Sequence, residues 1–407
     1  MNFAPARLLL ILMWPLLFLT PVSMQADDWP CFRGHHHDGV SKEKNWLTQW
    51  PKAGLKQVWR EKVGIGFSSV SVANGMAFTL GHTGGKDTLY CFDAKTGRKI
   101  WDYSWLSAIG AKFYIGGPGS TPTVAGDHVY VTGKWGEVMC LTRETGKMIW
   151  QRNVAKEDGV RVPTWGFNGS ALVQGERVLI NASAAGMALD RKTGKTLWKS
   201  ADGEAGYATP YPIMIDGKSH IVVSSGRAYS GVNVADGKET WSIRWFTRYG
   251  VNAADAIVDG NHVFIGSGYR KGCGLFTMAT EPKEIWKNKN LSTQCNGAVK
   301  IREYLYGFDG DSGGGGHLRC VDWKTGKIVW EEKLGFGSVM AADGKLIVLT
   351  AKGVLSTAPT SPKGFSPTGH TQVLEADCWT VPVLANGLLY CRNSKGDLVC
   401  LDLRVTP

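Results

Sequence analysis

A hairpin motif that ends in tryptophan recurs along the chain, with successive Trp residues 42–49 positions apart. Each copy has an apolar run, a turn based on Asp-x-Lys-Thr-Gly-Lys and a second run that ends in Trp. In such a turn the Asp side chain caps the backbone and the Gly adopts a positive φ, so each copy predicts a β-hairpin. A period of about 40–50 residues is typical of four-stranded propeller blades. The repeated residues are Trp59, Trp101, Trp150, Trp198, Trp241, Trp286 and Trp330.

A second pair of strands, with its own glycine turn, precedes each hairpin. Segments such as SVANGMAFTL (71–80), TVAGDHVYVTG (123–133) and IVDGNHVFIGSG (257–268) have apolar runs on both sides of a turn. The 52 Gly and 17 Trp among 407 residues fit many short strands joined by turns, because Gly is unfavourable in helices. Each repeat therefore predicts four strands.

The two ends of the repeat region complete one another. A seventh repeat, 335–375, is degenerate, with 373–374 in place of the Trp strand, and the eighth, 378–403, holds only three strands. The isolated strand around Trp59 supplies the fourth, and closing a ring removes exposed strand edges. A linear solenoid, the alternative, would need polar capping repeats. We predict an all-β, eight-bladed β-propeller over residues 55–407, with four-stranded blades and a ring closed by the N-terminal strand.

The segment before the ring divides into two parts. Residues 1–26 have the pattern of a signal peptide, with Arg7 ahead of the apolar run 8–19 and a cleavage site after Ala26. The alternative is an uncleaved anchor, although the run is shorter than a membrane span of about 20 residues. We expect export to the periplasm or beyond and no membrane span after cleavage. Residues 27–54 are expected to form a strap across one face of the ring.

The formal net charge of +11 is spread over the turns of the repeats. Such isolated lysines are typical of solvated turns, and no contiguous basic run indicates a nucleic-acid surface. Nucleic-acid binding is therefore not expected.

The nine cysteines fall into two groups. Equivalent positions in different blades lie too far apart for a disulfide, so the four that share one repeat position are expected to be small buried side chains. These four are Cys91, Cys140, Cys320 and Cys400. The others leave a bridge possible with its pairing open: Cys31, Cys273, Cys295, Cys378 and Cys391.

The Asp-x-x-Thr-Gly-Lys-x-x-Trp hairpins resemble the repeat of quinoprotein-type propellers, also called pyrroloquinoline quinone (PQQ)-like propellers. That family includes PQQ-dependent alcohol dehydrogenases and the outer-membrane assembly lipoprotein of the Bam complex. Segments such as WGFNGSALV (165–173), SGYRKGCGL (267–275) and CWTVPVLANGLLYCRN (378–393) are most similar to secreted PQQ-like propellers of planctomycetes and related bacteria. The resemblance covers nearly all of residues 28–403 and implies the propeller fold.

The sequence lacks two signatures of the catalytic members of this family. It has no pair of adjacent cysteines and no Cys-x-x-Cys-His segment, and no Ca²⁺ ligand set can be assigned by motif. We therefore expect no catalytic residues and no cofactor, with a PQQ-dependent alcohol or sugar dehydrogenase that uses PQQ and Ca²⁺ as the alternative.

Ligand sites of propellers lie at the channel mouth, where the innermost strands begin. The residues expected there are aromatic, amide and cationic, which suits a polar or stacking ligand, although they could equally plug the channel. They are Trp165, Phe167, Asn168, Tyr207, Arg248, Tyr249, Asn252, Asn296 and Trp379. Asp309 and Asp311, in GFDGDSGGGG, are the candidate metal ligands, with a capped glycine loop as the alternative.

The prediction for function is a non-catalytic exported scaffold. Its channel face would bind an envelope protein or a small ligand, and the protein is expected to be a monomer.

Overall fold

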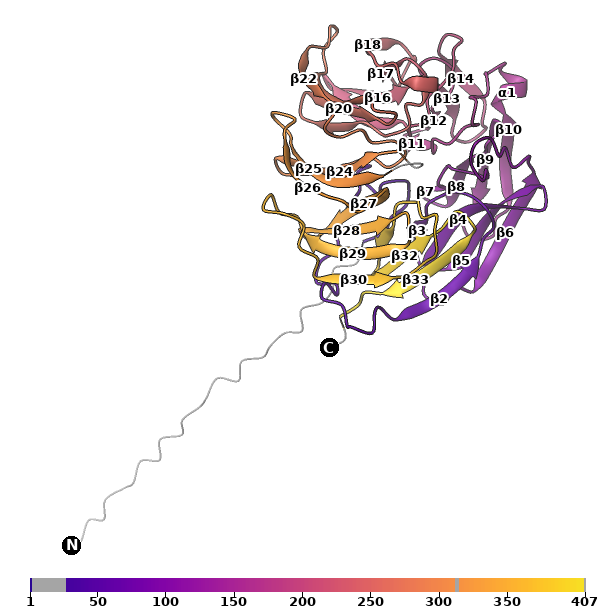
Figure 1. Cartoon of the computed structure of the whole chain (residues 1–407). Coiled ribbons are helices and arrows are strands. Elements are labelled where there is room, and N and C mark those ends of the chain that lie inside the picture. The colour runs from indigo at the N-terminus through magenta and orange to yellow at the C-terminus, as the bar shows by residue number, and fades with distance from the viewer. Residues whose placement is uncertain (2–26, 312–314, 406–407) are drawn as a thin grey trace.

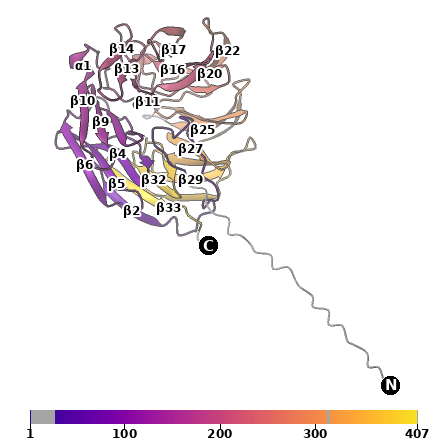
Figure 2. The ribbon, with the colours of Figure 1, turned by 180° about the vertical axis from the view of Figure 1, so that it is seen from behind.

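The structure, a computed structural model, describes residue 1 and residues 27–311 and 315–405. Within these residues the strands form eight sheets that follow one another around a ring (Figure 1), which Figure 2 shows from behind. Each sheet contains an antiparallel run of four neighbouring strands, numbered here as blades 1 to 8 in chain order, and the sheet of blade 7 has one further strand, β1 (Val40–Ser41), added in parallel. The prediction of an eight-bladed β-propeller with four-stranded blades is confirmed.

The strands of each blade run from the channel outwards. Blades 1 to 4 consist of β3 (Ser71–Ala73), β4 (Met76–Thr83), β5 (Lys86–Asp93), β6 (Lys99–Leu106); β7 (Thr123–Ala125), β8 (His128–Thr132), β9 (Glu137–Thr142), β10 (Met148–Asn153); β11 (Leu172–Gln174), β12 (Arg177–Ile180), β13 (Met187–Asp190), β14 (Thr196–Lys199); and β15 (Tyr211–Ile215), β16 (Lys218–Ser224), β17 (Ala228–Asn233), β18 (Glu239–Arg244). Blades 5 to 8 consist of β19 (Ile257–Asp259), β20 (His262–Ser267), β21 (Gly272–Thr277), β22 (Glu284–Asn288); β23 (Val299–Ile301), β24 (Tyr304–Gly310), β25 (Gly316–Asp322), β26 (Ile328–Glu332); β27 (Gly337–Ala342), β28 (Lys345–Thr350), β29 (Val354–Pro359), β30 (Gly369–Gln372); and β31 (Val383–Ala385), β32 (Leu388–Arg392), β33 (Asp397–Asp402) with β2 (Gln57–Lys62).

The N-terminal strand closes the ring, as predicted. β2 pairs antiparallel with β33, with Trp59 opposite Cys400, so the indigo and yellow ends of the chain share one sheet in Figure 1. Arg392 of the same blade reaches into blade 1, where its buried guanidinium donates to the carbonyl oxygens of Ser68 at 3.0 Å and Leu80 at 2.7 Å. Backbone pairing and this buried cation together join the last blade to the first.

The repeated tryptophans join each blade to the next. In blade 2, for example, Trp150 donates from Nε1 to the carbonyl oxygen of Arg191 in the turn of blade 3. The glycine of that turn, Gly194, lies so close to the indole that an added Cβ would be 2.6 Å from the ring. The same hydrogen bond links Trp59 to Ala94, Trp101 to Arg143, Trp198 to Val234, Trp286 to Trp323 and Trp330 to Ser361. The turn glycine is thus needed both for its φ and for the space that the neighbouring indole takes.

Trp241 of blade 4 is the exception to this pattern. The turn of blade 5 reads Thr-Glu-Pro-Lys and has no glycine. The Nε1 of Trp241 is buried with no hydrogen-bond partner among the described residues, and its ring lies instead over Gly231 of its own blade. The loss of the turn glycine and the loss of the hydrogen bond therefore coincide.

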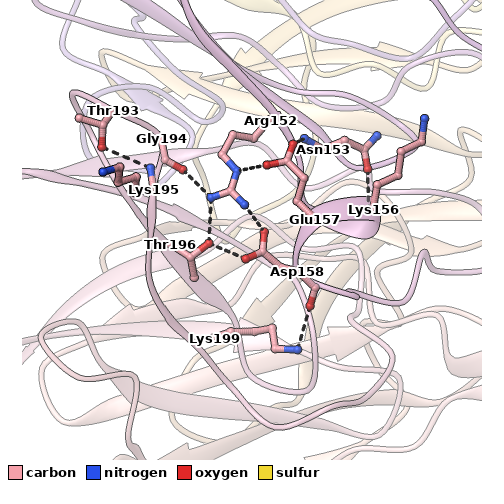
Figure 3. Close-up of polar contacts among 10 residues, drawn as sticks. All are labelled: Arg152, Asn153, Lys156, Glu157, Asp158, Thr193, Gly194, Lys195, Thr196 and Lys199. Carbon is pink, nitrogen blue, oxygen red and sulfur yellow. Dashed lines mark hydrogen bonds and ion pairs between the residues drawn. The ribbon is translucent and has the colours of Figure 1, made fainter.

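A polar cluster adds to the contact between blades 2 and 3 (Figure 3). Arg152, at the end of β10, donates to Glu157 at 2.6 Å and to Asp158 at 2.9 Å, both next to the short helix α1 (Val154–Glu157). It also donates across the blade boundary to the carbonyl oxygen of Gly194 and to the hydroxyl of Thr196. One guanidinium thus holds the helix and the next blade in place.

The first part of the segment 27–54 lies along innermost strands of the ring, and its second part lies against the C-terminal residues and the outermost strand of blade 7, β30. Its Trp29 pairs with Val72 of β3 through two backbone hydrogen bonds, and Arg33 donates to the carbonyl oxygen of Ala298 beside β23 at 2.8 Å. Further along, β1 (Val40–Ser41) pairs in parallel with β27 of blade 7. This segment is called the strap below, and it contacts the inner parts of blades 1, 2, 6 and 7.

All nine cysteines are free thiols, so none of the five whose pairing was left open forms a bridge. The four repeat cysteines are buried, and each lies directly across a strand pair from a repeat tryptophan, as in Cys140 opposite Trp150. No helix in the described part of the chain is long and apolar enough to cross a membrane. The expected signal peptide lies, apart from Met1, outside the described residues.

Candidate functional site

A cavity of about 710 Å³ occupies the channel at the end where the innermost strands begin. Its wall comes mainly from the segments just before these strands in six of the blades, from the loop 107–119 between blades 1 and 2, and from one strap residue. The lining residues are Phe32, Phe67, Ser69, Lys112, Phe113, Tyr114, Gly119, Thr164, Trp165, Asn168, Ser170, Tyr207, Thr209, Tyr249, Val251, Ala253, Asp255, Tyr269, Gln294, Cys295, Asn296, Trp379, Thr380 and Val381. This volume lies within the range of about 300–1,000 Å³ that is typical of small-molecule sites.

Aromatic rings form much of this wall. Phe67 stacks on Trp379 with ring centroids 5.1 Å apart and lies 5.7 Å from Tyr114. On another part of the wall, Trp165 meets Tyr207 edge-on at 6.0 Å. Such ring pairs offer flat faces and edges to a ligand while they stay fixed by one another.

Three of the aromatic residues have strained backbones. Phe113, Tyr249 and Tyr269 have φ values of 66°, 67° and 55°, in the left-handed region that bulky side chains rarely adopt. Phe113 is 92% exposed and Tyr249 57% exposed. Strain of this kind is concentrated at functional sites, where the surroundings hold it in place. For Tyr269 the support is visible, because its backbone N–H donates to Asp311 Oδ1 at 2.5 Å.

A belt of hydrogen bonds runs around the deeper part of the wall. Ser69, Thr121, Ser170, Thr209 and Asp255 each stand two residues before the innermost strand of blades 1 to 5. The backbone N–H of each of the first four donates to the side-chain oxygen of the next, at 2.8–3.1 Å. The acceptor is a hydroxyl in three of these steps and a carboxylate in the last. This belt fixes the loops of five blades relative to one another.

The carboxylate that ends the belt is in an unusual environment. Asp255 is 7% exposed, and burial raises its pKa to about 6, against the opposing effects of Arg33 and of the Thr209 N–H. Its Oδ1 accepts the hydrogen bond from Thr209, and its Oδ2 accepts none from any described residue. Asp255 lines the cavity, so one oxygen of a nearly buried carboxyl is available to a ligand.

Two other reactive groups lie at or behind the wall. The Cys295 thiol is exposed to the cavity, but its position deep inside the ring raises its pKa to about 12, so it is not a thiolate nucleophile at neutral pH. Behind Tyr114, burial lowers the pKa of Lys134 to about 8, and its amine donates to the Tyr114 hydroxyl and to the carbonyl oxygen of Gly117. Lys134 is not a lining residue and reaches the wall only through the Tyr114 hydroxyl.

The structure brings six of the nine predicted site residues together in the cavity wall. They are Trp165, Asn168, Tyr207, Tyr249, Asn296 and Trp379.

The other three predicted residues lie elsewhere. Phe167 packs into the hydrophobic core between blades 2 and 3, because neighbouring residues in an extended segment point in opposite directions. Asn252 is fully buried and donates to the carbonyl oxygens of Ser225 and Trp245, so it holds a loop. Arg248 is an exposed residue outside the wall, with its guanidinium 4.9 Å from the ring of Tyr249.

The carboxylate oxygens of the two candidate metal ligands bind other residues of the chain. Asp309 accepts from the Ser292 N–H through Oδ1 and pairs with Arg319 through Oδ2, while Asp311 supports Tyr269. Among the residues that the structure describes, no group of three or more His, Cys, Asp and Glu side chains could hold a metal ion. Asp309 and Asp311 thus each hold a neighbouring segment of the chain in place.

Comparison with known proteins identifies the family. A family model described as outer membrane protein assembly factor BamB, built on the PQQ-like repeat, matches residues 40–159 and 85–332, more than half of the chain. The chain belongs to this PQQ-like propeller family. The closer likeness to planctomycete proteins is not tested by these matches and stays a prediction.

Named members of the family and solved propellers are similar over most of the chain. The outer membrane protein assembly factor BamB of Salmonella typhimurium is 28% identical over 74% of this chain and 76% of its own length. The crystal structure of BamB from Moraxella catarrhalis covers 86% of this chain and 99% of its own at 15% identity, with a TM-score of 0.61. Quinohemoprotein alcohol dehydrogenase from Comamonas testosteroni covers 93% of this chain and 81% of its own at 11% identity, with a TM-score of 0.70. At these identities the two structures show the shared fold alone.

The wall of this PQQ-like propeller is a poor fit to Ca²⁺ and PQQ. Ca²⁺ prefers six to eight oxygen ligands with several carboxylates, whereas among the described residues of the cavity wall Asp255 is the one carboxylate. PQQ is a polycarboxylate, and the one cationic side chain in the wall is Lys112, which is exposed. The chain also lacks the adjacent cysteines of the catalytic quinoproteins.

Proposed function

We propose that this PQQ-like propeller is an exported, non-catalytic binding scaffold whose ligand or partner enters the channel-face cavity. The observation that carries the proposal is a cavity in the channel that is walled by aromatic residues, three of them with strained backbones. Strain of this kind costs folding free energy. We infer that contacts with a ligand at the channel mouth offset this cost. The thiol, amine and carboxylates near the cavity lack the arrangement of a catalytic pair.

The relatives support a binding role in the cell envelope. The matching family model and the Salmonella typhimurium protein are described as an outer membrane protein assembly factor, which is a role in assembly. With the signal-peptide pattern of residues 1–26, we infer that the protein works in the periplasm or outside the cell, bound to an envelope protein or a small ligand. Mass spectrometry of the mature protein, expected to begin at Asp27, tests the export step.

A dehydrogenase is the second candidate, favoured by the sequence similarity to the quinoprotein alcohol dehydrogenase PedH of Pseudomonas putida, which is 24% identical over 62% of this chain. Titration of the mature protein with PQQ, with and without Ca²⁺, tests this candidate through quinone absorbance and thermal stability. Saturable, Ca²⁺-dependent binding with alcohol-dependent dye reduction would establish the dehydrogenase and overturn the scaffold. We expect no such binding, because the wall offers neither a Ca²⁺ cluster nor a set of cations.

Affinity capture from the envelope tests the scaffold directly. Wild type is compared with a Trp165→Ala/Tyr249→Ala variant, which removes two rings from the cavity wall. A matched control, Ile149→Ala/Leu197→Ala, removes two apolar residues of similar exposure, 44% and 47%, from outer strands far from the cavity. We expect the cavity variant alone to lose the molecule that wild type retains. Equal retention by all three proteins would show that the cavity is not the binding site.

A further inference from the structure

We infer that the ligand of this cavity is a small organic cation, an amine on an aromatic or aliphatic body, whose charge pairs with Asp255. The inference rests on the proposed function, because it names the ligand class of the same cavity. Its basis is the difference between what the hydrogen-bond belt requires at this position and what the chain places there.

The belt requires an oxygen acceptor but no charge. Thr121, Ser170 and Thr209 accept the equivalent N–H with a hydroxyl, at 2.8–3.1 Å. Asp255 accepts the Thr209 N–H at 2.8 Å with one oxygen of a carboxyl group that is 7% exposed. A hydroxyl would serve the belt equally well and avoid the cost of burying a charge. The carboxylate therefore has a purpose beyond the belt.

The free oxygen of Asp255 has no cation of the protein to pair with. Among the described residues no Lys, Arg or His lies within salt-bridge distance of this carboxyl. Arg33 is the nearest in effect, but it directs its guanidinium to the carbonyl oxygens of His37, Asp38 and Ala298. A buried carboxylate with an open side is a site for a cation that comes from outside.

The other cations around the cavity are directed elsewhere or lie at its mouth. The Lys134 amine donates to Tyr114 and Gly117 behind the wall. Lys112 and Arg248 are both exposed side chains, where solvent and salt screen their charges. Asp255 is therefore the one charged group that the deeper wall presents directly to a ligand.

The aromatic walls favour the same class of ligand. A cation near the faces of Trp and Tyr is attracted by the ring quadrupole, and the attraction grows when water is excluded. Trp165, Tyr207 and Tyr249 line the cavity together with Asp255. A ring-bearing amine can stack on these residues while its ammonium group reaches the carboxylate. An anionic ligand gains the stacking alone and is repelled by the buried carboxylate.

Three probes of one shape and different charge test the inference at pH 7.5. They are phenethylamine, 2-phenylethanol and phenylacetate, titrated into the mature protein by calorimetry and by the fluorescence of the cavity tryptophans. We expect the amine to bind at least about tenfold more tightly than the alcohol, and phenylacetate more weakly than either. In Asp255→Thr, which keeps an acceptor for the Thr209 N–H, the preference for the amine should disappear while the affinity for the alcohol stays. Asp127→Asn, which removes a charge from an 89% exposed side chain far from the cavity, should keep the preference.

The outcomes separate this inference from the proposed function. Four results would each overturn the inference that the ligand is a cation. They are equal binding of amine and alcohol, tighter binding of phenylacetate than of the amine, no binding of the amine, and a preference for the amine that survives in Asp255→Thr. In all four cases the capture experiment with the Trp165→Ala/Tyr249→Ala variant still decides whether the cavity is the binding site. Failure of the capture experiment together with no binding of any probe would overturn both.

Discussion

Replacing Asp255 by threonine should stabilise the ligand-free protein at neutral pH. The substitution keeps a side-chain oxygen for the Thr209 N–H, as Thr209 itself does for Ser170. It removes a carboxyl group that is 7% exposed and whose pKa is raised from 3.8 to about 6, chiefly by burial. A shift of about two pKa units corresponds to about 3 kcal/mol of folding free energy. We expect the free energy of unfolding of Asp255→Thr to exceed that of wild type by no more than this amount.

The pH dependence gives the sign of the effect. Below about pH 4 the Asp255 carboxyl group is protonated in both the folded and the unfolded chain, so burying it costs little folding free energy. Between pH 4 and about 6 the unfolded chain releases the proton and the folded chain retains it, so wild type loses stability as the pH rises through this window. Arg33 and the Thr209 N–H favour the charged form and limit the loss. The difference between variant and wild type should therefore be near zero at pH 4 and reach its full value above pH 7.

Urea denaturation at pH 4 and pH 8 measures this difference. Asp309→Asn serves as the opposite case, because the Asp309 carboxylate pairs with Arg319 at 2.8 Å and its loss should destabilise the protein. The reasoning would be refuted by an Asp255→Thr variant that is less stable than wild type at pH 8, or by an equal difference at both pH values. Phenethylamine should raise the melting temperature of wild type more than that of the variant, since only wild type has the carboxylate.

Three further substitutions test the contacts between blades, each by urea denaturation. Gly194→Ala should cost about 1–3 kcal/mol more than Gly217→Ala, because both have a positive φ near 71° but only the first meets the indole of the preceding blade; equal costs would contradict the role of that contact. Arg152→Met should cost about 2–3 kcal/mol, since its charged hydrogen bonds join two blades. The control for Arg152→Met is Lys192→Met, which removes an exposed ion pair within blade 3 and should cost less than about 1 kcal/mol. Trp59→Ala should cost about 3–5 kcal/mol and open the ring at its closure; a loss below about 1 kcal/mol would show that β2 is dispensable.

The propeller architecture could be predicted because each sequence repeat corresponds to one blade. The turn that precedes each tryptophan and the spacing between tryptophans report the blade directly, and the unmatched strand around Trp59 reports the closure. The structure adds the reason that Gly and Trp recur together, as at Gly194 and Trp150, where the indole lies on the glycine of the next blade. That contact joins residues in different repeats, so the pattern of one repeat does not reveal it.

The candidate site could be predicted only in part because it is built by residues outside the repeat. Phe32 belongs to the strap, and Phe113 and Tyr114 belong to the connection between blades 1 and 2, outside the repeated hairpins. The prediction that Phe167 lines the channel was wrong, because its side chain packs into the core while that of its neighbour Asn168 lines the cavity. The direction of a side chain in an irregular segment depends on the packing around it. Asp255 had a signal that was missed, because it stands where blades 1 to 4 have Ser or Thr.

Blade 5 departs from the repeat on both its outer and its inner side. Its outer turn has no glycine, and Trp241 of blade 4 consequently has no hydrogen-bond partner among the described residues. Its inner end carries the carboxylate of the belt, and the strained residues Tyr249 and Tyr269 stand before and within this blade. Six repeat tryptophans each donate a hydrogen bond to the turn of the next blade, so the fold is kept although Trp241 lacks this contact. A closed ring thus allows the region around blade 5 to hold strain and a buried charge, and we infer that ligand binding compensates for both.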